Sequence, residues 1–263
     1  MLQNKVIFLT GGADGIGWEC ARAYARNGAL LCIADIKPLK QEQLAVLDGE
    51  GHLSVCCDLA REAEVQQAVQ TAVREFGGLD AIHNNAAVTH PSKPLHTTSN
   101  EEWDLLMEVN VKSILYTTRY GLPHLRQPGG VFLMTSSLVG SIGQEHHAAY
   151  VATKGAVNAL VKAMALDYAP LGIRVNAIGP AAIRTQALEA WSREQPDTTA
   201  IRDYLDQLQP LGAMPAGDVI ADAAVFLLSN AARFITGCIL PVSGGAELGY
   251  RSVSANHTKS FSK

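Results

Sequence analysis

The 263-residue sequence has few charged residues, no basic excess and no long apolar run. Only 17% of its residues are charged and the formal net charge is -4, whereas nucleic-acid-binding proteins need a basic face to neutralise phosphates. No stretch approaches the ~18 uninterrupted apolar residues of a membrane helix, and the apolar run at 6–9 is too short for a signal peptide. We therefore expect a cytoplasmic protein whose partner is a small-molecule substrate, with no nucleic acid and no membrane.

The cysteines are few and irregularly spaced, which argues against a disulfide framework. There are five, an odd number with no CxxC pair, so we predict buried apolar thiols in a reduced compartment. They are Cys20, Cys32, Cys56, Cys57 and Cys238. The adjacent His146 and His147 rarely point at one centre and have no third ligand at suitable spacing, so we expect no metal site.

Short apolar runs alternate with longer segments of helical spacing along most of the chain. The apolar runs predict strands at 5–10, 30–35, 52–57, 80–84, 130–136, 173–178 and 238–242. The helical segments include 15–27, 61–76, 101–125, 149–170 and 217–229. Expected helix ends are the capping-box pair Ser99 and Glu102 and the C-terminal stops Gly28, Gly77 and Gly172. This alternation predicts an α/β fold with a doubly wound parallel sheet of Rossmann type.

The chain shows no boundary between two halves. It has no proline- or serine-rich linker and no repeat of fixed period, so we predict a single domain over 1–250. Residues 185–215 form a predicted helical insertion, which we expect to act as a substrate lid over a pocket. Residues 251–263 are polar and patternless, which predicts a flexible tail.

A glycine-rich turn, TGGADGIG at 10–17, joins the first predicted strand to the first predicted helix. Glycines let the backbone turn tightly and approach a pyrophosphate, to which the helix N-terminus presents free N–H groups. Asp35 ends the second strand, where a carboxylate accepts hydrogen bonds from the adenosine ribose hydroxyls and repels the extra phosphate of NADP. Asp14 adds to that repulsion and Lys37 opposes it, so two carboxylates against one lysine favour NAD as cofactor.

Polar residues at later strand ends extend the predicted cofactor site. Asp58 follows the third predicted strand, where a side chain meets the adenine, and the sequence NNAA at 84–87 follows the fourth. Taken singly, each is about equally compatible with a polar cap at the end of the sheet.

Tyr150 and Lys154 are placed to form a reactive pair. Their i, i+4 spacing on a predicted helix puts the phenol and the ammonium on one face. The cation favours the phenolate and so lowers the phenol pKa from about 10 toward that of a general base. Short pairs of this kind also arise by chance, and a surface tyrosine beside a solvated lysine is the alternative.

Taken together, these motifs resemble the short-chain dehydrogenase/reductase family in its ~250-residue form, in the same order over residues 5–246. The matching blocks are the TGxxxGxG-like turn at 10–17, the NNAG-like block at 84–87, the segment around Asn110, Ser137 after a strand, the YxxxK pair at 150–154, NAIGP at 176–180, and Thr185. Three residues depart from the family pattern, namely Ala87, Ala181 and Ser243. The two alanines each add a methyl group where the backbone usually approaches a ligand, which puts affinity and substrate size in doubt.

The resemblance implies a role for each reactive residue. Tyr150 would remove the hydroxyl proton as general base while a hydride leaves for the nicotinamide ring. Lys154 would lower the pKa of that tyrosine and hold the nicotinamide ribose, and Ser137 would hydrogen-bond the substrate oxygen. Asn110 would anchor a water in a proton relay. The implied cofactor contacts are Gly11, Asp14, Gly15, Ile16, Gly17, Asp35, Asp58, Leu59, Asn85, Ala86, Tyr150, Lys154, Pro180, Ile183 and Thr185.

The expected substrate side mixes hydroxyl, amide, imidazole and indole groups. Its candidate residues are Ser137, Gln144, His147, Tyr150 and Trp191. Such a mixture suits a polyhydroxylated substrate, because hydrogen bonds reject wrong sugars better than apolar shape does. We therefore expect NAD-dependent oxidation of a secondary alcohol or a sugar hydroxyl to the ketone or lactone. The alternatives are a 3-oxoacyl thioester reductase of the acyl-carrier-protein type, which usually draws on NADPH, and a non-catalytic NAD-sensing protein.

The resemblance also implies a homo-oligomer, either a dimer or a tetramer, built through the helices at 101–125 and 149–170. An apolar face with small side chains on the second helix permits close helix packing. It comprises Ala156, Ala159, Leu160 and Ala163, and it could equally cover the chain's own sheet.

Overall fold

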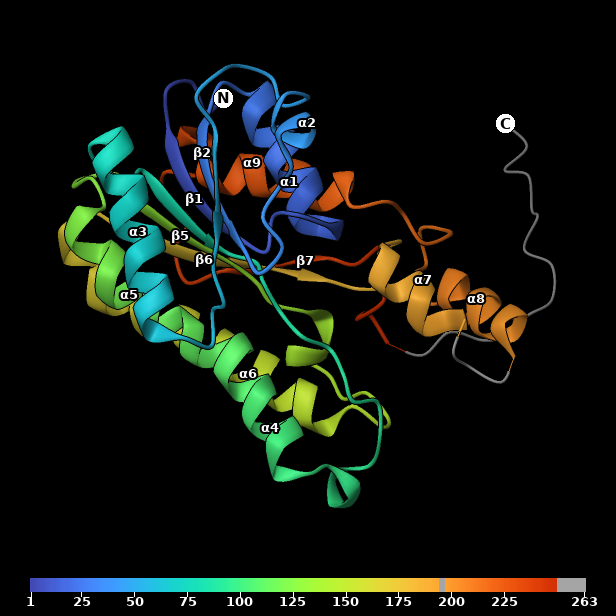
Figure 1. The fold of residues 1–263 in the computed structure, drawn as a ribbon. Coiled ribbons are helices and arrows are strands. Elements are labelled where there is room, and N and C mark those ends of the chain that lie inside the picture. The colour runs from blue at the N-terminus through green and yellow to red at the C-terminus, as the bar shows by residue number, and fades with distance from the viewer. Residues whose placement is uncertain (194–196, 250–263) are drawn as a thin grey trace.

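Seven parallel strands form one sheet in the computed structural model, which describes residues 1–193 and 197–249 (Figure 1). The strands are β1 Val6–Thr10, β2 Leu30–Asp35, β3 Leu53–Cys56, β4 Ala81–Asn84, β5 Val131–Thr135, β6 Arg174–Pro180 and β7 Ile239–Val242. Their order in the sheet is β3-β2-β1-β4-β5-β6-β7, and every neighbouring pair is parallel. The predicted α/β fold with a doubly wound sheet is therefore confirmed. The predicted tail at 251–263 lies outside the described residues.

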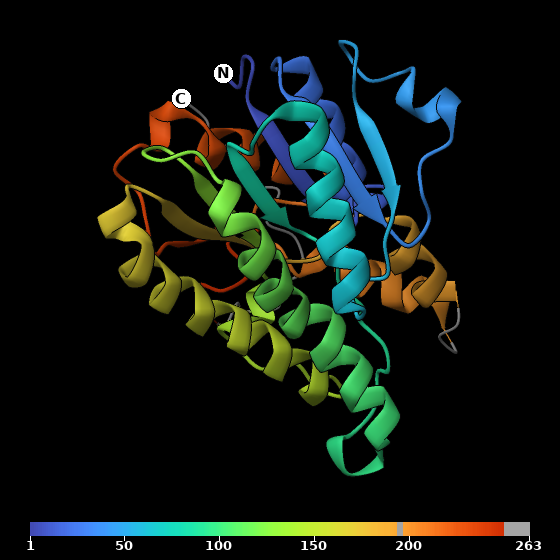
Figure 2. The same cartoon turned by 60° about the vertical axis from the view of Figure 1, so that its left-hand side comes forward.

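Helices cover both faces of the sheet, which explains why its central strands are continuous apolar runs. On one face, Ile7 and Leu9 of β1 pack under α1 (Gly15–Arg26) and α9 (Asp218–Leu228). On the other face, Val6 and Phe8 of the same strand lie in a second core, covered by α3, α5 and α6 (Figure 2). These three helices span Glu62–Phe76, Ser113–Gly121 and Ala148–Tyr168.

The predicted helix at 101–125 is in fact interrupted. It begins as α4 (Asn100–Met107) behind the expected capping box of Ser99 and Glu102, and then widens to a π-helical turn at Glu108–Lys112. It continues as α5 and ends in a 3-10 turn at Leu122–His124. Turns of the π type occur often at functional sites, and this one carries Asn110, a residue expected to be catalytic.

The insertion expected at 185–215 is helical within its described part. Helices α7 (Gln186–Arg193) and α8 (Thr198–Gln207) stand beside the main body, at the right of Figure 1. Hydrogen bonds close its base, because Gln209 Nε2 donates to Ala182 O at 2.6 Å and the Arg184 amide donates to Pro215 O at 2.8 Å. The remaining short helix, α2, spans Gln41–Leu44.

Several local expectations are tested by backbone geometry and burial. Gly28, Gly77 and Gly172 each have positive φ just after a helix, as predicted for C-terminal stops. The expectation of buried cysteines is wrong for Cys56, which is exposed at the end of the edge strand β3, and only partly right for Cys238. All five cysteines are free thiols. Within the described residues, no helix combines the length and the hydrophobicity that a bilayer crossing requires.

Candidate active site

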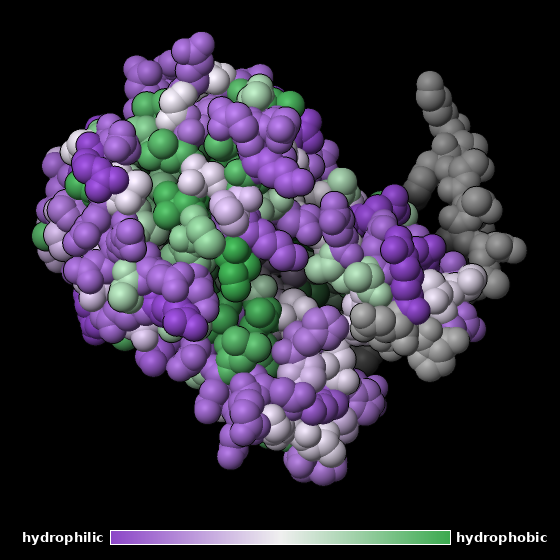
Figure 3. Space-filling view, in the orientation of Figure 1, coloured by the Kyte–Doolittle hydropathy of each residue, from purple (hydrophilic) through white to green (hydrophobic). Residues whose placement is uncertain are grey.

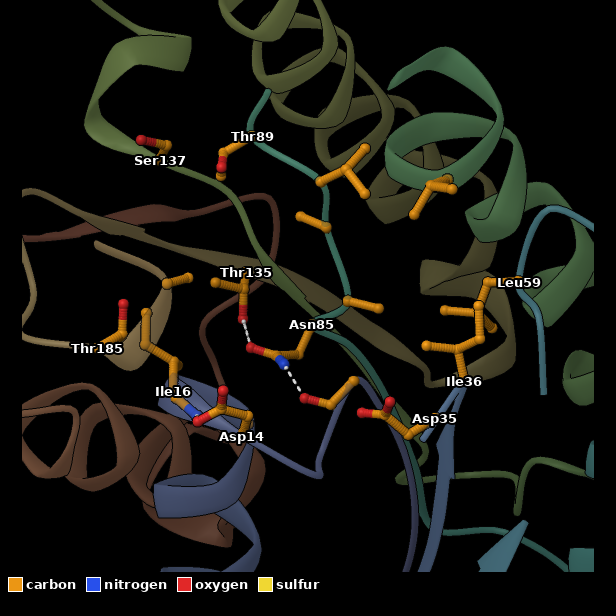
Figure 4. A pocket seen from close by; sticks show the side chains of 18 of the residues that line it. Asp14, Ile16, Asp35, Ile36, Leu59, Asn85, Thr89, Thr135, Ser137 and Thr185 are labelled. Atoms are coloured by element: carbon orange, nitrogen blue, oxygen red, sulfur yellow. Dashed lines mark hydrogen bonds between the residues drawn. The ribbon is translucent and has the colours of Figure 1, made fainter. Parts of the chain in front are cut away.

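A cavity of about 640 Å³ opens at the carboxyl ends of the strands. It lies where the strand order changes direction, between β1 and β4. Open parallel sheets bind their ligands at such switch points. Expected site residues that line it are Gly11, Asp14, Gly15, Ile16, Gly17, Asp35, Asp58, Leu59, Asn85, Ala86, Ser137, Tyr150, Lys154, Pro180 and Thr185. In Figure 4, Asp35 and Leu59 lie toward one end, Ser137 lies at the other, and Asn85 lies between them. The cavity therefore suits an elongated ligand.

The glycines of the turn serve two different purposes. A Cβ on Gly11 would lie 2.6 Å from Ala86 Cα, and a Cβ on Gly17 would overlap the Gly11 carbonyl oxygen. These two glycines are required by close packing within the protein itself. Gly15, with φ of +53°, has only Thr185 near its missing side chain and faces the cavity. Thr185 in turn accepts a hydrogen bond from the Leu188 amide and so begins α7.

Two carboxylates border the turn, as the sequence predicts. Asp14 caps α1 by accepting a 2.6 Å hydrogen bond from the Gly15 amide. Asp35 Oδ2 accepts from the Ala13 amide at 3.0 Å and Oδ1 from the Lys37 amide at 2.9 Å, so its carboxylate is fixed against the turn. Lys37 is exposed and is not among the residues that line the cavity.

Asp58 and Asn85 also lie at the cavity, Asp58 held by a local hydrogen bond and Asn85 by hydrogen bonds to distant parts of the chain. Asp58 accepts from the Ala60 amide at 3.0 Å. Asn85 Nδ2 donates to the carbonyls of Thr10 and Gly11, while its Oδ1 accepts from Thr135 Oγ1 at 2.9 Å (Figure 4). Asn85 therefore joins the glycine turn to the end of β5.

Tyr150 and Lys154 share one face of α6, with the ammonium nitrogen 5.6 Å from the centre of the phenol ring. Lys154 Nζ donates to Thr135 O at 2.8 Å, and burial lowers the Lys154 pKa to about 8. Burial raises the Tyr150 pKa to about 12, and a hydrogen bond with Ser137 acts in the opposite direction. The expectation of a lowered tyrosine pKa is thus wrong for the unliganded protein, because desolvation of the phenolate outweighs the neighbouring groups.

Asn110 lies in the π-helical turn, buried and outside the residues that line the cavity. Its Oδ1 accepts from the Val88 amide and its Nδ2 donates to the Val88 carbonyl, both at 2.8 Å. A third contact, at 3.1 Å, joins Nδ2 to Thr153 Oγ1. Asn110 therefore holds the loop after β4 against α6, the helix that carries Tyr150.

Four other expected residues also lie apart from the cavity lining. Ile183 is buried in the core beside α1 and α9, and Gln144 is exposed. Trp191 lies on α7 and is partly buried. His147, at the start of α6, faces Tyr150 edge-on with ring centres 6.3 Å apart, and its Nε2 lies 2.8 Å from Ser92 Oγ. Burial lowers the pKa of His147.

Sequence reasoning missed several residues of the cavity wall. Thr135 ends β5 beside the expected serine, so its place at a strand end was an available signal. Leu105 of α4 and Val109 of the π-helical turn are four residues apart and line the wall, a spacing that also fits ordinary core packing. Both unusual alanines, Ala87 and Ala181, border the cavity. Within residues 1–193 and 197–249, no group of three or more His, Cys, Asp or Glu side chains could hold a metal ion.

Comparison with known proteins gives consistent matches over nearly the whole chain. The family profile described as Enoyl-(Acyl carrier protein) reductase matches residues 11–247. An L-fucose dehydrogenase from Bos taurus is 42% identical over 94% of this chain and 91% of its own length. A 2,5-dichloro-2,5-cyclohexadiene-1,4-diol dehydrogenase from Sphingobium indicum is 35% identical over 93% of this chain and 97% of its own length.

Solved structures match the fold equally well. The structure of a 3-ketoacyl-(acyl-carrier-protein) reductase from Brucella melitensis complexed with NADH has a TM-score of 0.82 and 32% identity, covering 94% of this chain and 99% of that one. An aldohexose dehydrogenase from Thermoplasma acidophilum has a TM-score of 0.85 and 27% identity, covering 97% and 98%.

Proposed function

The chain belongs to the short-chain dehydrogenase/reductase family, and we propose that it uses NAD to oxidise the hemiacetal hydroxyl of a sugar, giving the lactone. It is an oxidoreductase that interconverts a secondary alcohol or sugar hydroxyl and the corresponding carbonyl compound. The single observation that carries the choice of NAD is Asp35, whose carboxylate is fixed by two backbone amides at the end of the cavity where Leu59 also lies.

The residues present fit a dinucleotide. Gly15 leaves the N-terminus of α1 open to the cavity, which suits a pyrophosphate. Asp35 would accept hydrogen bonds from the adenosine ribose, and Asp58 and Leu59 would border the adenine. Pro180 and Thr185 would border the nicotinamide end, next to Lys154. When bound, the nicotinamide ring supplies the acceptor for the hydride.

The remaining chemistry is proton transfer by this chain's own side chains. Tyr150 would take the substrate hydroxyl proton on its phenolate oxygen as the carbon–hydrogen bond breaks. With a Tyr150 pKa of about 12 in the unliganded protein, phenolate is scarce near neutral pH, so the Lys154 ammonium and the Ser137 hydroxyl must favour it once substrate excludes water. Ser137 would also hold the substrate oxygen. We retain Asn110 as the residue that orders a relay water beside Lys154.

A sugar is the proposed substrate because of both the relatives and the groups near Tyr150. Two matched proteins are an L-fucose dehydrogenase and an aldohexose dehydrogenase. The imidazole of His147 faces the Tyr150 ring, and Gln144 lies three residues before it on the same loop. We propose that His147, Gln144 and Trp191 complete the substrate pocket when the insertion closes over it. Polar groups of this kind discriminate between sugars by pairing their hydroxyls.

The test is NADH formation with a panel of aldohexoses, deoxy sugars, polyols, hydroxysteroids and hydroxyacyl thioesters. We expect turnover with one or more sugars and a higher kcat/KM with NAD than with NADP. A preference for NADPH together with an acyl thioester would contradict the proposal and favour the thioester reductase instead. Two observations favour that alternative, the family profile described as Enoyl-(Acyl carrier protein) reductase and the match to the structure of a 3-ketoacyl-(acyl-carrier-protein) reductase.

Replacing Asp35 tests the cofactor choice directly. Asp35→Ser removes the carboxylate while leaving a small polar side chain beside the turn. We expect the ratio of NAD to NADP kcat/KM to fall by roughly 10- to 100-fold, the range of a lost charged hydrogen bond. Lys37→Ala is the matched control, since that side chain lies outside the cavity lining, and its ratio should stay within about 2-fold.

We also propose a cytoplasmic homo-oligomer, a dimer or tetramer that packs through α5 and α6. Ala159, Ala163 and Leu166 of α6 and Leu115 of α5 are exposed, so small and apolar side chains lie on the outer surface of both helices. Small side chains let two helices approach closely. Sedimentation of the wild type and of Ala163→Arg would test this, and a wild-type protein that sediments as a monomer would contradict it.

A further inference from the structure

A chain of hydrogen-bonded side chains crosses the protein from α1 to the glycine turn. Tyr24 Oη of α1 lies 2.8 Å from Nδ1 of His83, on β4, and Nε2 of that ring lies 2.9 Å from Thr135 Oγ1. Thr135 Oγ1 contacts Asn85 Oδ1 at 2.9 Å, and Asn85 Nδ2 contacts Gly11 O at 2.9 Å. The four side chains come from three separate segments, since His83 and Asn85 both lie at the end of β4, and Tyr24 and His83 are 59 positions apart in the sequence.

The position of each proton along this chain can be deduced by starting from the Asn85 end. Asn85 must turn its amide nitrogen toward the backbone carbonyls of Thr10 and Gly11, because two facing oxygens would repel. Its oxygen then accepts the single hydroxyl proton of Thr135, so Thr135 Oγ1 must accept from Nε2–H of His83. Nδ1 of His83 therefore carries no proton and accepts from the Tyr24 hydroxyl.

Burial keeps water from competing with this arrangement. Tyr24 and His83 are both 0% exposed, so water cannot replace either partner. Burial also lowers the His83 pKa to about 3, so the ring stays neutral and keeps one tautomer throughout the physiological range. Hydrogen bonds aligned in one direction polarise and strengthen one another in such an environment.

Thr135 connects this chain to the reactive end of the cavity. Its hydroxyl belongs to the chain, while its backbone carbonyl accepts the 2.8 Å hydrogen bond from Lys154 Nζ. Thr135 lies at the end of β5 and so takes part in two hydrogen bonds, one with Asn85 and one with Lys154. A shift of Thr135 would therefore change both the glycine turn and the position of the ammonium.

We propose that Tyr24 and His83 are positioning residues for the dinucleotide, acting through Thr135 and Asn85 to fix the glycine turn relative to Lys154 before the cofactor binds. The proposal rests on the proposed function, because it assumes that a dinucleotide occupies the cavity. A buried imidazole among the apolar neighbours of β4 costs free energy unless both of its nitrogens are paired, and here both are.

Two sets of variants test the role. Tyr24→Phe removes the hydroxyl that donates to Nδ1 of His83, and His83→Leu removes the whole link, whereas His83→Gln keeps an amide N–H that can reach Thr135. Dissociation constants for NADH come from its fluorescence on binding. We expect about 5-fold weaker binding in Tyr24→Phe, about 10-fold or more in His83→Leu, and partial rescue in His83→Gln, as for one or two lost hydrogen bonds.

A matched control separates positioning from general loss of stability. Val225→Ala on α9 lies in the same core as Tyr24 and has no part in the chain. We expect it to lower the melting temperature as much as Tyr24→Phe or more, with the NADH dissociation constant unchanged. Equal weakening of NADH binding in Val225→Ala and Tyr24→Phe would overturn the positioning role.

A spectroscopic measurement tests the proton assignment without activity or ligand. Long-range ¹H–¹⁵N correlation of the histidine rings in the unliganded protein should show His83 as the neutral Nε2–H tautomer, and Tyr24→Phe should disturb that signal. An Nδ1–H tautomer in the wild type would overturn the proposal. If the wild type shows the expected tautomer but binds no dinucleotide, the proposed function and the positioning role both fail, whereas unchanged NADH binding in all three variants overturns the positioning role alone.

Discussion

The proposed cofactor half of the cavity and its proposed substrate half are built in different ways. The cofactor half lies at the ends of β1, β2, β4 and β5, where hydrogen bonds hold Asp35 and Asn85 to the glycine turn and Thr135 to Asn85. The proposed substrate half is formed by loops and by α7, which lines the cavity through Ala187, with Gln144 exposed and Trp191 outside the cavity lining. Figure 3 shows a hollow between the insertion and the main body on that face.

The difference is consistent with the separate tasks of the two halves. A cofactor shared by many enzymes can be bound by a preformed site. Preformation lowers the free-energy cost of ordering side chains when the ligand binds. A substrate site that discriminates between similar sugars gains from loops that close around the ligand and exclude water. We therefore expect substitutions in the first half to change cofactor affinity and those in the second half to change KM.

The largest effect should come from the residue where the two halves meet. Tyr150→Phe keeps the ring in place and removes the proton acceptor, so kcat should fall about 1000-fold, within the usual range for a lost general base. NADH affinity should change less than about 2-fold, since the phenol is not needed to fill the cofactor half. Both quantities are read from NADH absorbance and fluorescence. Activity at the wild-type level would show that another group is the base.

The glycine turn offers the next largest effect and contains its own control. In Gly17→Ala the added methyl meets the Gly11 carbonyl and Asn85 Nδ2, so the turn must shift. NADH binding should weaken by roughly 10- to 100-fold, in line with overpacking. In Gly15→Ala the added Cβ would lie 3.4 Å from Thr185, an ordinary contact, so the turn need not shift. The free energy of unfolding should fall by only about 1 kcal/mol, the strain of an alanine at this positive φ. Equal losses of NADH affinity in Gly17→Ala and Gly15→Ala would contradict the distinction between a glycine required by packing and one that faces the ligand.

The buried histidine predicts how the cofactor half responds to acid. The folded His83 pKa of about 3 lies below its ordinary value of about 6.5, so between these values the unfolded chain binds a proton that the folded chain does not. The free energy of unfolding should therefore decrease as the pH is lowered below 6.5, by up to about 1.4 kcal/mol per pH unit. The groups that face the ring, Tyr24 and Thr135, stay neutral there.

Denaturant unfolding at pH 7 and pH 5 measures this slope. From pH 7 to pH 5 the free energy of unfolding should decrease less in His83→Gln than in the wild type. The difference between the two decreases should be up to about 2 kcal/mol. Identical slopes in the two proteins would mean that His83 is already protonated, or is exposed, in the folded state.

The smallest effect should come from the substrate half. Trp191→Ala removes an aromatic ring from α7, and we expect KM for the sugar to rise about 5-fold with NADH affinity unchanged. A matched substitution on the same helix, Glu189→Ala, should leave KM within about 2-fold. A change in NADH affinity in Trp191→Ala, with KM unaffected, would show that the insertion serves the cofactor instead.

The sequence predicts the sheet well because both of its faces are covered, so strands such as β1 and β5 read as apolar runs that end in a single threonine. It does not predict the π-helical turn at Glu108–Lys112, since one wider turn changes neither composition nor the apolar pattern noticeably. The exposure of Cys56 also depends on the strand order, because only an edge strand leaves that side chain uncovered.

For the site, the motifs locate residues at strand ends and helix starts, where parallel strands bring their carboxyl ends to one edge. Ile183 is the exception among the expected cofactor contacts, since it faces the core beneath α1 and α9. The link between Tyr24 and His83 lies beyond sequence reasoning, because a pair 59 residues apart becomes visible only once helix and strand are packed. The Tyr150 pKa is likewise set by burial, which no local pattern reports.

The closed base of the insertion also matters for engineering. Gln209 and Ala182, and likewise Arg184 and Pro215, are joined by direct hydrogen bonds, so the chain leaves the sheet and returns to it at nearly one point. Segments whose ends meet in this way can be exchanged with little disturbance to the domain that carries them. The span from 186 to 208 is thus a natural unit for grafting, in which a different pair of helices would give a new specificity on an unchanged cofactor half.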